Sequence, residues 1–178
     1  MVEKPASGPD KGRQCRSGKG DETTVVKSRA STLIASPPEQ VFEFIAVNFE
    51  RNYSRWSPEV KALEVLTPGP LGIGTKARQV RIDQGRQSNS TFSVTAFEPP
   101  RRVSFAESTD QFRTDYQVDP VGKQTRLTFA FELRRLELYM RPFEKLIRVA
   151  IQDGAERVVR NIKSLVEREM ARQSSGQV

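Results

Sequence analysis

The 178-residue sequence predicts an α+β domain, in which a long C-terminal helix covers a curved antiparallel sheet of about six or seven strands. The strand segments between residues 60 and 133 alternate apolar and polar residues and are separated by short turns. Residues 138–172 instead carry an apolar stripe at helical spacing. Because a one-faced sheet has to bury its apolar side, this helix is expected to lie against it.

The chain is expected to begin with a disordered tail, residues 1–21, which holds few large apolar groups. Residues 23–36 are rich in β-branched side chains and predict a strand. Pro37 and Pro38 suit a helix entrance. Apolar residues then recur at helical spacing, and these are Val41, Phe42, Ile45 and Phe49. A second short helix is expected over residues 50–56, before Pro58.

The remaining strands follow one another through short turns, which indicates an antiparallel meander. They are predicted over residues 60–67, 75–82, 90–97, 103–108, 112–118 and 125–133. In the third of them Phe92, Val94 and Ala96 are expected to share one face. The domain is therefore expected to span residues 22–172, with the long helix from about Leu138 to Arg172 and a disordered end over residues 173–178.

The composition excludes several kinds of site. One cysteine, Cys15, and no histidine leave neither a disulfide within the chain nor the usual zinc ligands, and they exclude Ser-His-Asp and Cys-His catalysis. We expect no metal and no cofactor. The net charge of +7 is spread along the chain among acidic residues, so we expect no nucleic-acid partner.

The sequence shows no apolar run near the ~20 residues of a membrane span, and its N-terminus has no apolar signal core. We therefore expect a cytoplasmic location and no stable insertion into a membrane. The oligomeric state stays open.

The stretch GPLGIGTK, residues 69–76, resembles a phosphate-binding loop of the form G-x-x-x-x-G-K-[ST], with Thr75 and Lys76 in reverse order. Such a loop joins a buried parallel strand to a helix. The segment after these glycines has no helical stripe, so the glycines and prolines are predicted to form a tight connection between strands.

Several motifs occur in a characteristic order between residues 23 and 169: ASPPEQVFEFI, NYSRWSPEVKALEVL, G-x-G-T and TAFEPPRRVSF, followed by an amphipathic helix. This set resembles the polyketide cyclase/dehydrase-like branch of the START/Bet v 1-like (SRPBCC) superfamily. The resemblance implies a helix-grip fold with a cavity between sheet and helix. Members bind lipids, polyketides, sterols and other apolar molecules, and some are aromatases or cyclases. The family offers no common catalytic triad to carry over.

The apolar faces of sheet and helix supply the candidate cavity wall, and without the resemblance they would be interpreted as a packed core. The candidates are Trp56, Phe92, Val94, Phe105, Tyr116, Phe129, Phe131, Phe143, Ile147 and Ile151. An empty pocket of ~300 Å³ would cost on the order of 7 kcal/mol, so a cavity here should be small, wet or occupied.

Tyr116 and Glu107 are the catalytic candidates. Side chains alternate along a strand, and each of these two residues falls on the apolar face of its own predicted strand. The Tyr116 hydroxyl either orients a ligand or bonds to a buried carbonyl, and Glu107 either points inward or lies in water at the rim. Arg78 and Arg81 lie on opposite faces of one strand, so at most one of them points inward. Trp56 either covers one end of the cavity or pins the short helices to the sheet.

Three functions remain open. The first is binding, transport or sequestration of a small hydrophobic or amphipathic molecule. A structure without a pocket beyond a few water volumes beneath the helix would contradict it. The second is a polyketide cyclase/dehydratase-like enzyme acting on a carbonyl compound. The third is an interaction module that uses the basic tail and the last helix. That helix carries Arg148, Arg157, Arg160 and Lys163, although acidic neighbours favour a merely solvated face.

Overall fold

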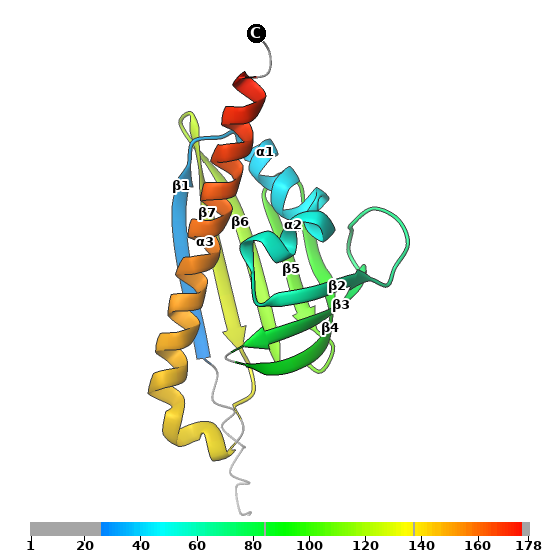
Figure 1. Ribbon diagram of the computed structural model, residues 1–178, viewed down its shortest axis with the longest axis vertical. Coiled ribbons are helices and arrows are strands. Elements are labelled where there is room, and N and C mark those ends of the chain that lie inside the picture. Colours follow the sequence, from blue (N-terminus) through cyan, green and yellow to red (C-terminus); the bar gives the residue numbers. More distant parts are fainter. Residues whose placement is uncertain (1–25, 84, 137, 176–178) are drawn as a thin grey trace, which may run out of the picture.

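The computed structural model describes residues 26–83, 85–136 and 138–175, and within them it forms one seven-stranded antiparallel sheet (Figure 1). The strand order is β1-β7-β6-β5-β4-β3-β2, which confirms the meander. The strands are β1 (Val26–Ile34), β2 (Val60–Val65), β3 (Lys76–Asp83), β4 (Arg86–Glu98), β5 (Arg102–Glu107), β6 (Phe112–Val121) and β7 (Gln124–Leu133).

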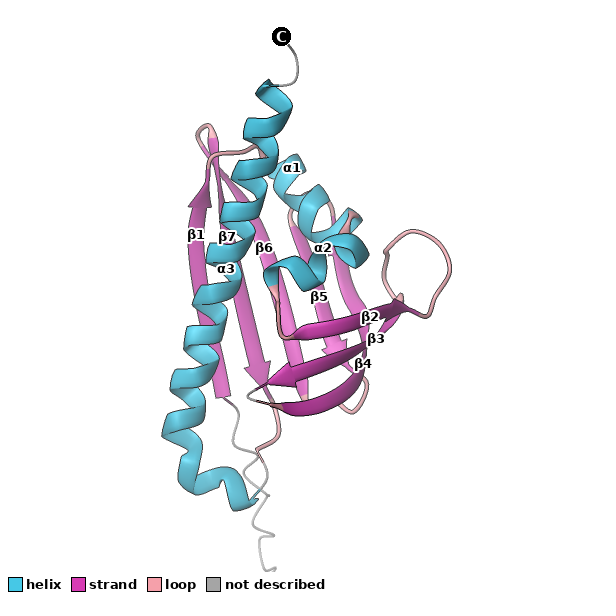
Figure 2. Ribbon diagram, in the orientation of Figure 1, coloured by secondary structure: helices cyan, strands magenta, loops and turns pink. Residues whose placement is uncertain are grey.

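The helices lie on one side of the sheet (Figure 2). They are α1 (Pro38–Phe42), a π-helical turn η1 (Glu43–Val47), α2 (Phe49–Trp56), a 3₁₀ turn η2 (Leu138–Phe143) and α3 (Glu144–Ser175). The long helix α3 runs against β1 and β7, and α2 contacts β2. Sheet and long helix together form the predicted helix-grip arrangement.

The ends of the chain differ from the sequence-based expectation where they are described. The helix α3 continues to Ser175, so residues 173–175 are helical instead of disordered. Its predicted first turn is 3₁₀, with Pro142 inside it. The predicted N-terminal tail and residues 176–178 lie outside the described residues.

A β-bulge in β4 corrects one predicted face. The pairing of β4 with β5 shifts between Val94 and Ala96, so that Phe97 lies opposite Val103. Since a bulge inserts one extra residue, the alternation changes phase there. Phe97 instead of Ala96 then faces the helices, and its ring meets Phe42 of α1 at 5.6 Å.

The glycine-rich stretch joins two antiparallel strands, as predicted. It connects β2 to β3, and its backbone has positive φ at Gly69 (103°) and Gly74 (85°), a conformation that glycine adopts without penalty. The Gly72 N–H donates to Thr75 Oγ1, and the Gly74 N–H donates to the carbonyl of Val94. With no helix after it, the loop lacks the geometry of a phosphate-binding loop.

Polar side chains of α3 satisfy the free edge of β1. An edge strand presents unpaired backbone groups that invite pairing with other chains. Here two of them are occupied, since Gln152 donates to the Arg29 carbonyl and Lys163 donates to the Leu33 carbonyl. Directly after the strand, Glu167 accepts from the Ala35 N–H. These contacts fix α3 along the edge of the sheet.

The apolar stripe of α3 is buried only in its C-terminal part. Ala155, Val159, Ile162 and Val166 are buried. The first turns, in contrast, leave Phe143, Leu146 and Val149 largely exposed. The prediction that Phe143 belongs to the buried stripe is therefore wrong, whereas Ile147 and Ile151, which were also predicted, are half-buried.

Candidate functional site

The interior between α2 and the sheet is a cluster of aromatic rings. Phe49, Tyr53 and Trp56 project from one face of α2, because residues three and four apart share a face. Phe49 stacks on Phe105 of β5 at 4.8 Å between ring centroids. Tyr116 of β6 lies 4.8 Å from Phe129 of β7. The cluster continues through Phe92 of β4, whose ring meets Phe49 and Phe105 edge-on.

A small void lies within this cluster. It has a volume of about 10 Å³, room for about one water molecule. The lining residues are Phe49, Tyr53, Phe92, Phe105, Phe112, Thr114 and Tyr116. Typical ligand pockets begin near ~300 Å³. The void is therefore smaller than the few water volumes expected of a binding cavity. It counts against a preformed site for an organic ligand, which would have to displace side chains.

A larger groove, of about 360 Å³, lies outside the cluster between β1 and α3. Most of its lining is polar, with Arg29, Ser31, Gln152 and Arg160 among the contributing residues. Since apolar ligands are held mainly by apolar walls, this open groove suits them less than the aromatic cluster does.

One buried polar group of the cluster, the indole N–H of Trp56, has no hydrogen-bond partner. Trp56 is fully buried, and its indole N–H has no partner. It lies beside the hydroxyl of Tyr116, close enough to affect the ionisation of that hydroxyl but outside hydrogen-bonding geometry. Burial raises the pKa of Tyr116, so its hydroxyl is protonated at neutral pH. The cluster thus contains one buried donor without a partner, the Trp56 N–H, beside the protonated hydroxyl of Tyr116.

A second polar group borders the void at Tyr53. Its hydroxyl donates to Gln79 Oε1 at 3.1 Å, and Gln79 Nε2 donates to Ser90. Burial raises the pKa of Tyr53, although the neighbouring Arg81 guanidinium acts to lower it. Arg81 pairs with Asp83 at 3.2 Å. Arg81 is thus the inward-facing arginine of β3.

Arg78 of the same strand points outward. Its side chain is exposed and pairs with Glu64 of β2 at 2.5 Å. Only Arg81 of these two arginines therefore lies near the aromatic cluster.

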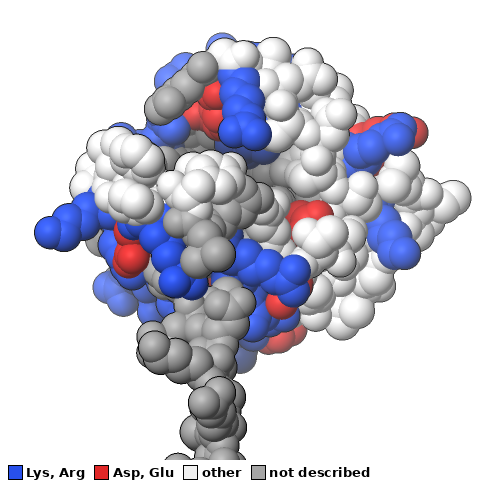
Figure 3. Space-filling model, turned by 90° about the horizontal axis from the view of Figure 1, so that it is seen from below, with Lys and Arg blue, Asp and Glu red and all other residues white. Residues whose placement is uncertain are grey.

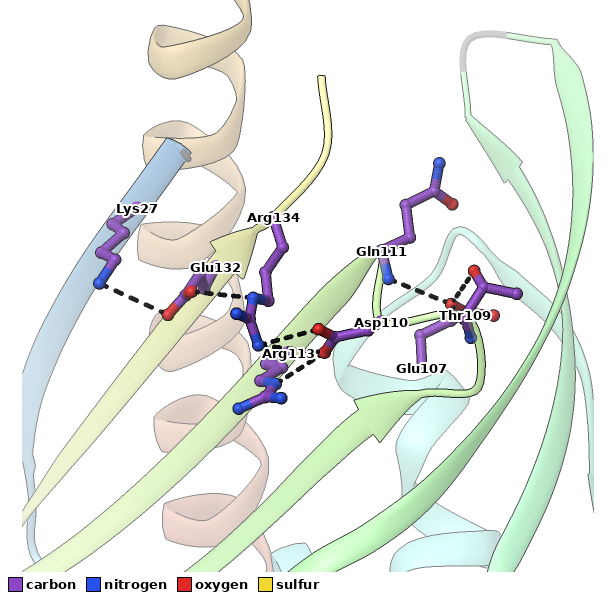
Figure 4. Close-up of polar contacts among 8 residues, drawn as sticks. All are labelled: Lys27, Glu107, Thr109, Asp110, Gln111, Arg113, Glu132 and Arg134. Carbon is purple, nitrogen blue, oxygen red and sulfur yellow. Dashed lines mark hydrogen bonds and ion pairs between the residues drawn. The ribbon is translucent and has the colours of Figure 1, made fainter. Parts of the chain in front are cut away.

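Glu107 organises a turn (Figure 4). Its Oε2 accepts hydrogen bonds from the Thr109 N–H (2.8 Å), the Thr109 hydroxyl (2.6 Å) and the Gln111 N–H (3.3 Å). These contacts hold the turn between β5 and β6, where Asp110 has a positive φ of 57°. Glu107 is buried, which excludes the rim position in water, but its carboxylate faces this turn instead of a ligand.

A chain of ion pairs links the strand ends beside that turn, as Figure 4 shows. Asp110 pairs with Arg113 at 3.0 Å and with Arg134 at 2.9 Å. Glu132 pairs with Arg134 at 3.5 Å and with Lys27 at 3.6 Å. This network ties β1, β7 and the β5–β6 turn together at one end of the sheet.

The predicted cavity residues fall into four groups. Phe92, Phe105 and Tyr116 line the void, while Trp56, Val94 and Phe129 are buried around it. Phe131 stacks on Phe112 at 5.9 Å and is half-buried, as are Ile147 and Ile151. Phe143 is 56% exposed, so its assignment to the cavity wall is wrong: the chain turns there through η2, before α3 reaches the sheet.

The lining also includes four residues that the predicted set lacks: Phe49, Tyr53, Phe112 and Thr114. Phe112 and Thr114 share the strand parity of Tyr116, and Tyr53 follows Phe49 by one helical turn. Those spacings were available in the sequence. The way α2 lies over β4 and β5 was not, because it depends on tertiary packing.

Within the described residues there is no group of three or more Cys, Asp and Glu placed to hold a metal ion. None of the described helices combines the length and the apolar character that crossing a membrane requires.

The comparisons with known proteins agree with this architecture. A family model described as polyketide cyclase / dehydrase and lipid transport matches residues 25–167. No curated protein matches the sequence.

Solved structures share the fold at low sequence identity. The ZhuI aromatase/cyclase from Streptomyces sp. R1128 superposes with a TM-score of 0.68 at 12% identity, covering 83% of this chain and 96% of that one. TTHA0849 from Thermus thermophilus gives 0.63 at 20% identity, covering 79% and 96%. The ginseng major latex-like protein 151 from Panax ginseng gives 0.60 at 13% identity, covering 79% and 96%. These likenesses confirm the helix-grip fold.

Proposed function

Because this chain belongs to the polyketide cyclase/dehydrase and lipid transport family, we propose that it binds a small, ring-containing amphipathic molecule in the aromatic cluster. One observation carries the proposal. The indole N–H of Trp56 is buried without a partner beside the protonated hydroxyl of Tyr116. Since an unsatisfied buried donor costs roughly 1–3 kcal/mol, an oxygen atom of a ligand that accepts this hydrogen bond would recover that energy.

The chemistry of the walls favours a flat ligand with one oxygen. Ring faces and edges surround the void, and aromatic pairs stabilise each other in stacked and edge-on arrangements. The two donors suit a carbonyl or hydroxyl oxygen. A fused-ring ketone or phenol meets both requirements, whereas an unbranched alkyl chain meets neither.

Entry requires a local opening at the end of the void marked by Phe112 and Thr114. Both side chains are only half-buried. The neighbouring Phe131 and the α3 residues Ile147 and Ile151 are half-buried as well. Since weakly covered side chains rearrange at lower cost than a packed core, we infer that a ligand enters here by displacing the Phe112 ring.

A cyclase- or dehydratase-like reaction on a carbonyl compound is the second candidate, because the protonated Tyr116 hydroxyl faces the void. A tyrosine in this state donates a hydrogen bond to a carbonyl oxygen but does not act as a base at neutral pH. Glu107 is engaged in its turn. The described cluster thus offers a donor without an accompanying base, which supports binding better than turnover.

The test is calorimetric titration of the full chain with 1-tetralone and 2-naphthol, beside decanoic acid as the unbranched probe. Thr114→Met fills the void and is expected to abolish binding of the ring compounds while leaving the fold intact. Thr95→Met, at an exposed position of β4, is the matched control and should bind like the unchanged protein. Equal binding by both variants, or preference for decanoic acid, would exclude the proposed site.

A further inference from the structure

Exposed apolar side chains gather at the start of the long helix. Four large hydrophobic side chains there are more than half exposed: Tyr139 (64%), Phe143 (56%), Leu146 (68%) and Val149 (58%). They fall within eleven residues, and Phe143, Leu146 and Val149 follow one another at intervals of three. Since residues three apart are neighbours on a helix, they form one continuous surface, here called the η2–α3 patch.

The sheet does not cover this patch. Leu146 precedes the buried Ala155 by nine residues, which is two and a half helical turns, so the two side chains project to opposite sides of α3. Clustered exposed apolar residues at such a position mark an interaction surface more often than scattered ones do.

Basic residues surround the patch. Residues 134–148 hold five Lys and Arg and two Glu. Arg135 and Lys145 are exposed and make no ion pair with the described residues. Arg148 pairs with Glu144 at 2.7 Å. Figure 3, which views this end of the molecule, shows Lys and Arg side chains among uncharged ones, with acidic side chains beside several of them.

The acidic side chains near this end are already paired. Glu132 pairs with Arg134 and with Lys27. Asp110 pairs with Arg134 and with Arg113. These two carboxylates therefore neutralise Arg134, whereas Arg135 and Lys145 keep their charge without an ion pair among the described residues.

The middle of α3 differs in this respect. There Arg157 pairs with Glu59 of another element, Arg160 pairs with Glu156, and Lys163 pairs with Glu167. The basic face suggested by the sequence is thus locally neutralised over these residues. The unbalanced positive charge lies at the helix start, where the apolar side chains are.

We propose that the η2–α3 patch docks this protein on an anionic lipid surface, with Phe143 and Leu146 inserted among the lipids and the basic residues against the headgroups. An apolar helix face flanked by Lys and Arg is the arrangement that binds such interfaces. A second copy of the chain is a poorer occupant, because it would bring one basic rim against another, in a protein of net charge +7.

The experiment is co-sedimentation of the full chain with vesicles of phosphatidylcholine alone and of phosphatidylcholine with 30% phosphatidylglycerol. Phe143→Glu and Leu146→Glu remove apolar area from the patch, and Lys145→Glu reverses a charge beside it. Ile73→Glu is the control for the first two, since Ile73 is 73% exposed in the β2–β3 loop. Lys123→Glu, in the turn between β6 and β7, is the control for the third. All five sites are exposed, so unchanged thermal midpoints are expected.

The unchanged protein should bind the anionic vesicles and not the neutral ones, and binding should weaken as salt is added. Phe143→Glu and Leu146→Glu should each weaken it about tenfold or more, Lys145→Glu severalfold, and the two controls not at all. Binding that survives the patch substitutions overturns the proposal, as does the absence of binding to anionic vesicles. Sedimentation equilibrium showing a dimer that Leu146→Glu dissociates would assign the patch to a second copy and overturn it too.

Discussion

The Trp56 indole N–H is buried beside the hydroxyl of Tyr116, with the ring centroids 6.3 Å apart, and no hydrogen bond joins the two groups. Folded proteins satisfy the large majority of their buried polar atoms, so such a pair needs an explanation. A site that receives an acceptor from outside the chain provides one. The pair therefore leads to predictions about stability as well as binding.

Tyr116→Phe should change the stability of the ligand-free protein by less than about 1 kcal/mol, because the hydroxyl lies outside hydrogen-bonding geometry with Trp56, the polar group beside it. The same substitution should weaken binding of 1-tetralone about tenfold by removing a donor. Urea unfolding and calorimetry measure the two effects. A loss of stability near 3 kcal/mol would reveal a structural role for the hydroxyl and contradict this account.

Alkaline pH should destabilise the fold through its buried tyrosines. Burial raises the pKa of Tyr116 and of Tyr53 in the folded state, and the nearby Arg81 partly offsets the second shift. The unfolded tyrosine ionises near pH ~10, so the stabilisation is complete below that pH and falls above it, by about 1.4 kcal/mol per pH unit for each tyrosine.

Urea unfolding between pH 8 and 11 measures this dependence, with Tyr116→Phe as the control. The variant should show a shallower loss of stability than the unchanged protein. Identical slopes for the two proteins would mean that Tyr116 ionises in the folded state as easily as in the unfolded one.

Glu107→Gln should destabilise the fold by about 1–3 kcal/mol, because the carboxylate oxygen accepts three hydrogen bonds from a single turn. Glu64→Gln, in an exposed ion pair of β2 and β3, is the matched control and should cost less than about 1 kcal/mol. Urea unfolding of both variants checks this difference. A Glu107→Gln variant with unchanged stability that loses turnover of a carbonyl substrate would restore the catalytic role predicted from the sequence.

Glu167→Ala should loosen the attachment of α3 to the end of β1. Glu167 accepts from the Ala35 N–H at 3.0 Å and pairs with Lys163 at 3.1 Å. Despite partial burial, which acts to raise it, these contacts hold the pKa of the Glu167 carboxyl below its ordinary value. Its stabilisation is therefore present above pH ~4.3 and lost as the pH falls further.

We expect a cost of about 1 kcal/mol for Glu167→Ala at pH 7, and faster hydrogen exchange at the Ala35 amide. The cost should shrink toward pH 3. Unchanged exchange at Ala35 would show that the side chain does not hold the strand edge.

The sequence predicts the fold well because each strand carries its own alternation and each turn its own Gly, Pro or Asp. The Trp-Ser-Pro turn correctly ends α2 at Trp56. Where the local pattern predicts the wrong orientation of a side chain, the reason is a feature of the backbone or of the tertiary packing. The bulge in β4 places Phe97 instead of Ala96 on the inner face, and the η2 turn leaves Phe143 in solvent although it continues the helical stripe.

The site is harder to predict than the fold. The alternation of side chains along the strands correctly places Tyr116, Phe105 and Phe92 on one face of the sheet. The distance between α2 and the sheet, however, decides whether these rings enclose a pocket or pack together. Glu107 is predicted to lie on the same face, and only the geometry of its turn shows which partners its carboxylate has. The polar environment of Arg81 likewise depends on Tyr53, a residue far away in the sequence.

Trp56 is the only tryptophan in the chain, so a ¹⁵N-labelled sample gives a single indole cross-peak that reports on the proposed site. Titration of the full chain with 1-tetralone is the most direct test. We predict a saturable downfield shift of the indole proton as the ligand oxygen accepts its hydrogen bond, and no shift in Thr114→Met. An indole cross-peak that stays in place while other signals move would place binding elsewhere, and a spectrum without any change would contradict ligand binding in the aromatic cluster.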